Sequence, residues 1–169
     1  MMASAEKEIL ENASNKLEYH LNMYVETLRW LTDDELRKDA PVLVANAVEE
    51  SHAVHARILI EFLGKKSPYR DTDVNAIDFY PPESAIIHEP AEDDFLTEWK
   101  RRIERRLLHQ TTKESTTFIS DWTWPIDRIA EKLHKYLLEF FSDASASKLR
   151  DIDRTQCLKH LNRLHPKTP

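Results

Sequence analysis

A run of five basic residues followed by a histidine is the group in this chain best suited to bind or react with a substrate. It consists of Lys100, Arg101, Arg102, Arg105 and Arg106, with His109 after them. On a helix, Arg102 and His109 would point nearly the same way, about 10 Å apart along the axis. Guanidinium groups bind phosphate, and an imidazole exchanges protons near neutral pH. The pattern indicates phosphate binding or acid–base chemistry on RNA, unless these bases only balance an acidic first turn of the same helix.

A second polar group lies on a segment that we expect to form an amphipathic helix from Pro41 to Gly64. Its members are Glu50, Ser51, His55 and Arg57. His55 falls near the centre of the apolar face, one turn after Ser51, where a polar group must be hydrogen-bonded. It is either a core histidine bonded to Ser51 or to a facing backbone group, or a site residue at the mouth of a cleft. The spacing of Arg57 and Glu61 predicts a surface ion pair.

Two Glu-x-x-His motifs, Glu49–His52 and Glu131–His134, match the pattern that ferritin-like di-metal bundles use. Those bundles need both glutamates to point into the core. Helical geometry instead places Glu49 and Glu131 each about 140° from the centre of its apolar face, toward solvent. The sequence therefore predicts no metal and no cofactor, and a di-metal bundle is the least favoured alternative.

Composition and periodicity favour an all-α fold. The chain has one glycine in 169 residues, against an average usage of about 7%, and tight hairpins depend on glycine. The motif Thr32-Asp33-Asp34-Glu35 predicts a capping box and a short helical turn. Apolar spacing predicts helices at 5–31, 41–64, 90–110, 125–141 and, more weakly, 147–164, with the longest irregular segment at 65–89.

These elements predict a single helical domain over 1–169. We expect a four-helix bundle over about 5–141 and an additional C-terminal helical segment over about 145–164. Cys157 is the only cysteine, the net charge is −6, and the N-terminus lacks a signal peptide's apolar run. No stretch has the roughly 18 apolar residues of a membrane span. We therefore expect a cytoplasmic protein with no membrane partner.

The motifs resemble those of known helical proteins. Glu50-Ser51, His55-Ala56-Arg57 and Glu61-Phe62-Leu63 resemble the second helix of a set of uncharacterised bacterial proteins. The stretch from Ile103 to His109 and the Trp124-Pro125 entry to a later helix resemble the same set. In layout these proteins are similar to the HEPN superfamily of four-helix domains, many of which are metal-independent ribonucleases in toxin–antitoxin and phage-defence systems.

The HEPN motif is an arginine followed by four to six residues and a histidine. Arg102 and His109 satisfy it, as do Arg128–His134 and Arg154–His160. The resemblance implies that Arg102 steadies a phosphate and His109 acts as general acid and base at the interface of a homodimer. Arg105 and Arg106 would then contact phosphate. The expected function is RNA binding or RNA cleavage; the alternative is a non-catalytic module that binds a partner protein.

Overall fold

The structure is a computed structural model that describes residues 4–64, 73–81, 93–108 and 124–164. These residues form helices and no strands, which confirms the predicted all-α class. The elements, in chain order, are α1 (Ser4–Thr32), α2 (Asp34–Arg37), α3 (Val42–Leu63), η1 (Ala76–Phe79), α4 (Asp94–Leu108), α5 (Ile126–Asp143), α6 (Asp151–Leu161) and η5 (Asn162–Leu164).

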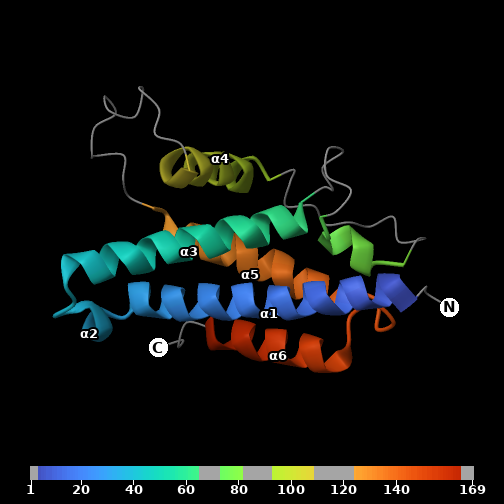
Figure 1. The fold of residues 1–169 in the computed structure, drawn as a ribbon. Helices are drawn as coiled ribbons and strands as arrows, with labels where there is room; N and C mark the ends of the chain where they lie inside the picture. Colours follow the sequence, from blue (N-terminus) through green and yellow to red (C-terminus); the bar gives the residue numbers. More distant parts are fainter. Residues whose placement is uncertain (1–3, 65–72, 82–92, 109–123, 165–169) are drawn as a thin grey trace.

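Four helices pack around a common core (Figure 1). Helix α1 packs against α3 on one side and α6 on the other, and α5 contacts both α3 and α6. Helix α4 lies against the outer side of α3. The C-terminal segment is therefore one of the four helices that enclose the core, and the helix with the basic run covers the bundle from outside.

The core forms where apolar residues recur at helical spacing. In α1 the buried stripe includes Leu17, Leu21, Tyr24 and Leu28, and in α5 it includes Ile129, Leu133, Leu137 and Phe140. Both stripes agree with the apolar spacing of the sequence. Such faces drive the packing because burial removes their apolar surface from water.

The buried face of α3 differs from the one expected. It consists of His52, Ala53, His55, Ala56, Leu59, Ile60 and Leu63. The apolar spacing predicts a face made of Val44, Val48, Ser51, His55, Ile58 and Phe62, so the observed centre is rotated by roughly 100° from the expected one. Val44 is exposed, while Ile58 and Phe62 are half-buried. Helix α3 contacts α1, α4 and α5, so residues on more than one side of it are buried. The prediction from apolar spacing holds only for a helix with a single buried face.

The helix ends follow the sequence signals with two differences. Helix α3 begins after Pro41 and ends before Gly64, as expected, but Gly64 has φ −73° and ψ 176°, which is extended rather than left-handed. The turn of α2 is capped by Asp33, whose carboxylate accepts hydrogen bonds from the backbone N–H groups of Glu35 and Leu36. Thr32 instead ends α1, where its hydroxyl donates to the Leu28 carbonyl at 2.9 Å.

Part of the expected irregular segment folds back onto the bundle. Within 73–81, η1 buries Ala76 and Phe79, and the Phe79 ring packs edge-on against Phe62 and Phe140. Lys148, which precedes α6, donates hydrogen bonds to the carbonyls of Asp78 and Tyr80. The remaining parts of 65–89, at 65–72 and 82–89, lie outside the described residues.

We expect Phe79→Ala to lower the free energy of unfolding by about 3–5 kcal/mol, because it removes a buried aromatic ring. Ile77→Ala, in the same turn, is the matched control; Ile77 is 38% exposed, so its loss should change stability by only about 0.5 kcal/mol. Urea unfolding followed by circular dichroism measures both. Equal effects would show that η1 does not anchor the segment.

Candidate functional site

The basic residues of α4 form an exposed surface beside the bundle. Arg101, Arg102 and Arg105 are exposed, whereas Leu96 and Ile103 of the same helix are buried against the core. This helix is amphipathic because its apolar residues recur on the side that faces α3. The side chain of Arg106 and the whole of His109 lie outside the described residues, as does Pro90, the expected start of the helix. The structure therefore gives no distance between Arg102 and His109.

Arg102 has two contacts on its own helix. Its guanidinium lies 4.9 Å from the centre of the Trp99 ring and donates a 3.0 Å hydrogen bond to Glu98. That hydrogen bond is the main cause of the lowered pKa of Glu98; the charges of Arg102, Arg105 and Arg101 act in the same direction and desolvation opposes them. The carboxylate of Glu98 thus lies in the positive field of all three arginines. Because the Arg102–Glu98 pair is exposed, exchanging its partner for a phosphate costs little.

Arg57 joins α3 to α4 through a network of alternating charges. Its guanidinium is 3.2 Å from Glu61, the ion pair expected from their spacing, and also 3.2 Å from Glu104 of α4. Lys100 of α4 lies 3.9 Å from Glu61 and 4.0 Å from Glu104. Sequence spacing identified only the pair within α3; the partners on α4 depend on tertiary packing.

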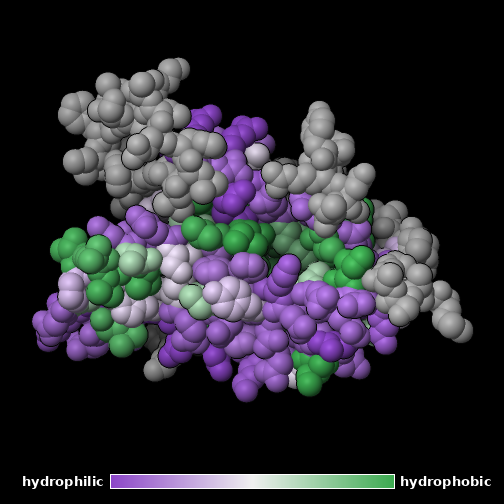
Figure 2. Space-filling view, viewed as in Figure 1, coloured by the Kyte–Doolittle hydropathy of each residue, from purple (hydrophilic) through white to green (hydrophobic). Residues whose placement is uncertain are grey.

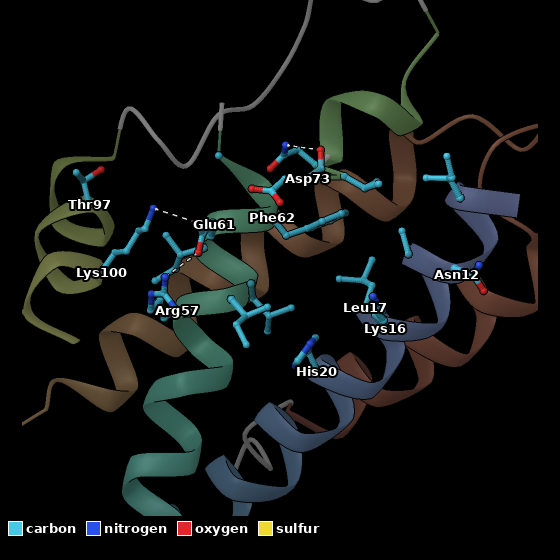
Figure 3. Close-up of a pocket in the computed structure, with 18 residues that line it drawn as sticks. Asn12, Lys16, Leu17, His20, Arg57, Glu61, Phe62, Asp73, Thr97 and Lys100 are labelled. Carbon is cyan, nitrogen blue, oxygen red and sulfur yellow. Dashed lines mark hydrogen bonds and ion pairs between the residues drawn. The ribbon is translucent and has the colours of Figure 1, made fainter. Parts of the chain in front are cut away.

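A cleft of about 740 Å³ opens beside this network (Figure 3). Its walls come from α1, the second half of α3, the segment 73–75 and α4. The polar side chains that line it include Asn12, Lys16, His20, Arg57, Glu61, Asp73, Asn75, Thr97 and Lys100. The cleft is thus a mixed-charge hollow on the side of the bundle where α1 and α3 diverge.

His55 points toward α1, away from the basic surface of α4. It is 7% exposed, and its Nδ1 lies 3.0 Å from Nδ1 of His20. The Tyr19 ring packs edge-on against both imidazoles. His55 is therefore a hydrogen-bonded buried histidine, but the partner expected from sequence, Ser51 or a backbone group, is wrong. His20 was missed, although it follows the buried Leu17 by three residues and so lies beside the same stripe.

His52, three residues before His55, is the second buried imidazole of α3. Its ring stacks on Tyr24 at 4.8 Å, and its Nδ1 lies 3.1 Å from Oγ1 of Thr27. The Thr27 hydroxyl donates to the Met23 carbonyl at 2.7 Å, so it accepts from Nδ1–H of His52. Burial lowers the pKa of His52 to about 4, with the nearby His55 adding to the effect and a backbone hydrogen bond at Tyr24 opposing it.

The four polar residues of the expected second group do not converge. Glu50 is exposed, Ser51 is half-buried, Arg57 pairs with α4, and His55 pairs with α1. Two residues of helix separate His55 from Arg57, a rotation of about 200°, which places them on opposite sides. The structure thus divides this group between two interfaces.

The Glu-x-x-His motifs also separate. Glu131 is exposed, as expected, but Glu49 is half-buried rather than exposed, because the buried face of α3 is rotated toward it. His52 is engaged by Thr27. Across the described segments, no group of three or more His, Cys, Asp and Glu side chains is arranged to hold a metal ion.

The other two Arg–His matches have contacts of their own. Arg154 donates hydrogen bonds of 2.7 Å to the Phe141 carbonyl and 2.6 Å to the Ala144 carbonyl, at the end of α5. The guanidinium of Arg128 lies 4.1 Å from the centre of the Phe95 ring. Arg154 is therefore a structural residue, whereas Arg102 is held only at the surface.

No protein-family model matches the sequence, and no curated protein or solved structure matches it significantly. None of the helices in the described segments is both long enough and apolar enough to span a bilayer.

We expect stability to fall as the pH drops from 7 to 5. Burial lowers the pKa of His52 to about 4, and burial also lowers the pKa values of His20 and His55, with Lys16 contributing at His20 and His20 contributing at His55. In the unfolded chain these groups take up protons below their ordinary pKa of 6.5, so the unfolded state binds more protons there and stability is lost as the pH falls from about 6.5 toward 4.

His52 alone should lower the free energy of unfolding by about 3 kcal/mol once the pH has fallen to about 4. Urea unfolding at several pH values measures the slope, and the range from 7 to 5 avoids most carboxylate titration. His52→Gln, which retains a hydrogen-bonding group, should flatten the slope. A wild-type protein equally stable at both ends of that range would refute the expectation.

Proposed function

We propose that this chain is a HEPN-like domain that binds RNA with the exposed arginines of α4 and cleaves it without a metal ion, as a homodimer. The observation that carries the proposal is the exposure of Arg101, Arg102 and Arg105 on one short helix. Phosphate groups attract such a surface, and counterion release supplies much of the affinity.

Arg102 is the arginine best suited to contact the scissile phosphate. Its guanidinium is exposed, stacks on the Trp99 ring and donates from Nε to the exposed Glu98, a partner that a phosphate can displace at the surface. In the proposed reaction, His109 removes the proton from the ribose 2′-hydroxyl, whose oxygen attacks the adjacent phosphorus. The His109 imidazolium formed in this way then gives the proton to the leaving 5′-oxygen. Arg102 stabilises the charge that develops on the phosphoryl oxygens.

A charge-neutralising pair on α4 tests RNA binding. We expect Arg101→Gln combined with Arg105→Gln to weaken binding of a single-stranded RNA and to reduce the salt-dependence slope by about 2. The matched control is Lys135→Gln with Lys159→Gln, which removes the same charge from exposed positions on α5 and α6. Fluorescence anisotropy at several salt concentrations, in the presence of EDTA, measures both.

The same RNA tests cleavage with His109→Ala and Arg102→Ala. Each variant should keep its circular dichroism spectrum and lose product formation. Arg154 and His160 match the same spacing away from α4, so His160→Ala is a control that should retain activity. If the α4 double variant and the lysine control lose RNA binding equally, α4 is not the binding surface. If His109→Ala cleaves RNA as fast as the wild type, His109 has no part in the reaction.

A second candidate, a non-catalytic interaction module, is favoured by exposed aliphatic side chains. Val42 and Leu43 are 75% and 79% exposed at the start of α3, next to the exposed Val44 and to Leu36 of α2. Figure 2 shows this apolar surface where α2 meets α3. Contiguous exposed apolar surface is typical of interaction sites. A module of this kind would bind a partner protein, or a second copy of this chain, through the exposed side chains at this surface.

Leu43→Glu should convert a dimer formed through this surface into a monomer, because a charge would be buried at the interface. Ile152→Glu is the matched control, since Ile152 is an exposed aliphatic residue on α6. Light scattering after size-exclusion chromatography gives the mass of each variant. A dimer that survives Leu43→Glu would exclude this interface, and RNA binding by the wild type would favour the first proposal.

A further inference from the structure

The paired imidazoles of His20 and His55 have the spacing of two ligands of one metal ion. Their Nδ1 atoms are 3.0 Å apart. Two imidazole nitrogens bound to the same zinc-sized ion, each about 2.0–2.1 Å from it, lie about 2.9 Å apart at a right angle and about 3.4 Å apart in a tetrahedron. The observed separation falls within that interval, so an ion can replace the hydrogen bond if each ring turns to point its Nδ1 at the ion while the distance between the two nitrogens is kept.

The two rings come from different helices and are held in place by packing. His20 lies on α1 and His55 on α3, the pair of helices with the most extensive contact in the bundle. The Tyr19 ring lies 5.3 Å from His20 and 5.7 Å from His55, centre to centre, and packs edge-on against each. Two ligands held in position in this way reduce the entropy lost when an ion binds.

Both imidazoles are suited to the neutral state that metal binding requires. Burial lowers the pKa of His20, with the Lys16 charge adding to it, and burial lowers the pKa of His55, with the His20 charge adding to it. In the hydrogen-bonded pair one ring donates from Nδ1 and the other accepts there. When an ion binds both Nδ1 atoms, the donor ring moves its proton to Nε2, and no proton is lost.

One of the two histidines lies at the wall of the cleft. His20 lines the cleft between α1 and α3, as Figure 3 shows, and Lys16 lines it one turn earlier. His52, the nearest other imidazole on α3, is engaged by Thr27 and stacked on Tyr24, so it is not a third ligand. Two protein ligands leave positions for water or for a donor atom of a small molecule, and the positive charge of Lys16 favours an anionic donor there.

We propose that His20 and His55 form a binding site for one divalent transition-metal ion of the kind that prefers imidazole, such as Zn²⁺, at the edge of the cleft. The site is separate from the Glu-x-x-His motifs and independent of RNA binding by α4. Because it has two protein ligands and a nearby lysine, we expect affinity in the micromolar range, typical of an exchangeable ion.

Titration of the full chain, after EDTA treatment and its removal, with Zn²⁺ in a calorimeter tests the site. We expect one ion per chain and a loss of affinity of roughly 100-fold in His20→Ala, since even loss of an outer hydrogen bond to a ligand costs 10- to 100-fold. His20 is half-buried and its replacement should leave the fold intact. His160→Ala is the matched control, because His160 is a half-buried histidine on α6.

Paramagnetic Co²⁺ provides a measurement on the unmodified protein. The imidazole signals of His20 and His55 should broaden together and before those of His160, and Zn²⁺ should restore them. The proposal fails if His20→Ala and wild type bind Zn²⁺ equally, if His160→Ala loses as much affinity as His20→Ala, or if Co²⁺ leaves the His55 signal sharp. The proposal is supported if His20→Ala loses Zn²⁺ affinity and if Co²⁺ broadens the imidazole signals of both His20 and His55 in the wild-type protein.

Discussion

The packing of α3 against α1 is the constraint on which the other features depend. This interface combines aliphatic side chains with a row of polar groups, in which Thr27 pairs with His52 and His20 pairs with His55. Buried polar groups are tolerated only in the geometry that satisfies them, so these pairs select one relative position of the two helices. The apolar contacts supply most of the stability, and the polar pairs define the register.

On the opposite side, α3 contacts α4, which buries the apolar side chains Leu96 and Ile103 and adds a network of charges at the edge of this contact. Arg57 contacts Glu104, and Lys100 approaches both Glu61 and Glu104. All four side chains are partly exposed, so each ion pair alone stabilises the contact between α3 and α4 only slightly. The stabilisation comes from the network of alternating charges as a whole. Helix α4 therefore carries exposed arginines such as Arg101 on its outer side, while the acids of this network contact its inner side.

The features that could be predicted from the sequence are those set by local apolar periodicity and by residues at helix ends. They include the main helices, the Pro41 and Gly64 boundaries of α3 and the core stripe of α5, because each depends on residues within a few turns. The prediction was wrong where several neighbours act on one helix, because the buried face of α3 lies about 100° from the stripe that its apolar spacing predicts. The partner of His55 lies 35 residues away on another helix, and no spacing rule in a single sequence encodes such a pair. Whether Arg102 and His109 act together stays a prediction.

The scarcity of glycine has a consequence for how the chain ends its helices. None of the described residues has a positive φ, so left-handed turns do not satisfy the final carbonyls. At two helix ends a cation does so: Arg154 of α6 reaches two carbonyls at the end of α5, and the nearby Arg37 of α2 reaches the Leu31 carbonyl near the end of α1. The end of α5 thus depends on a tertiary contact, so an excised α5 would lack the cation that satisfies these carbonyls. The last turn of α5 should consequently become ordered only when α6 docks beside it.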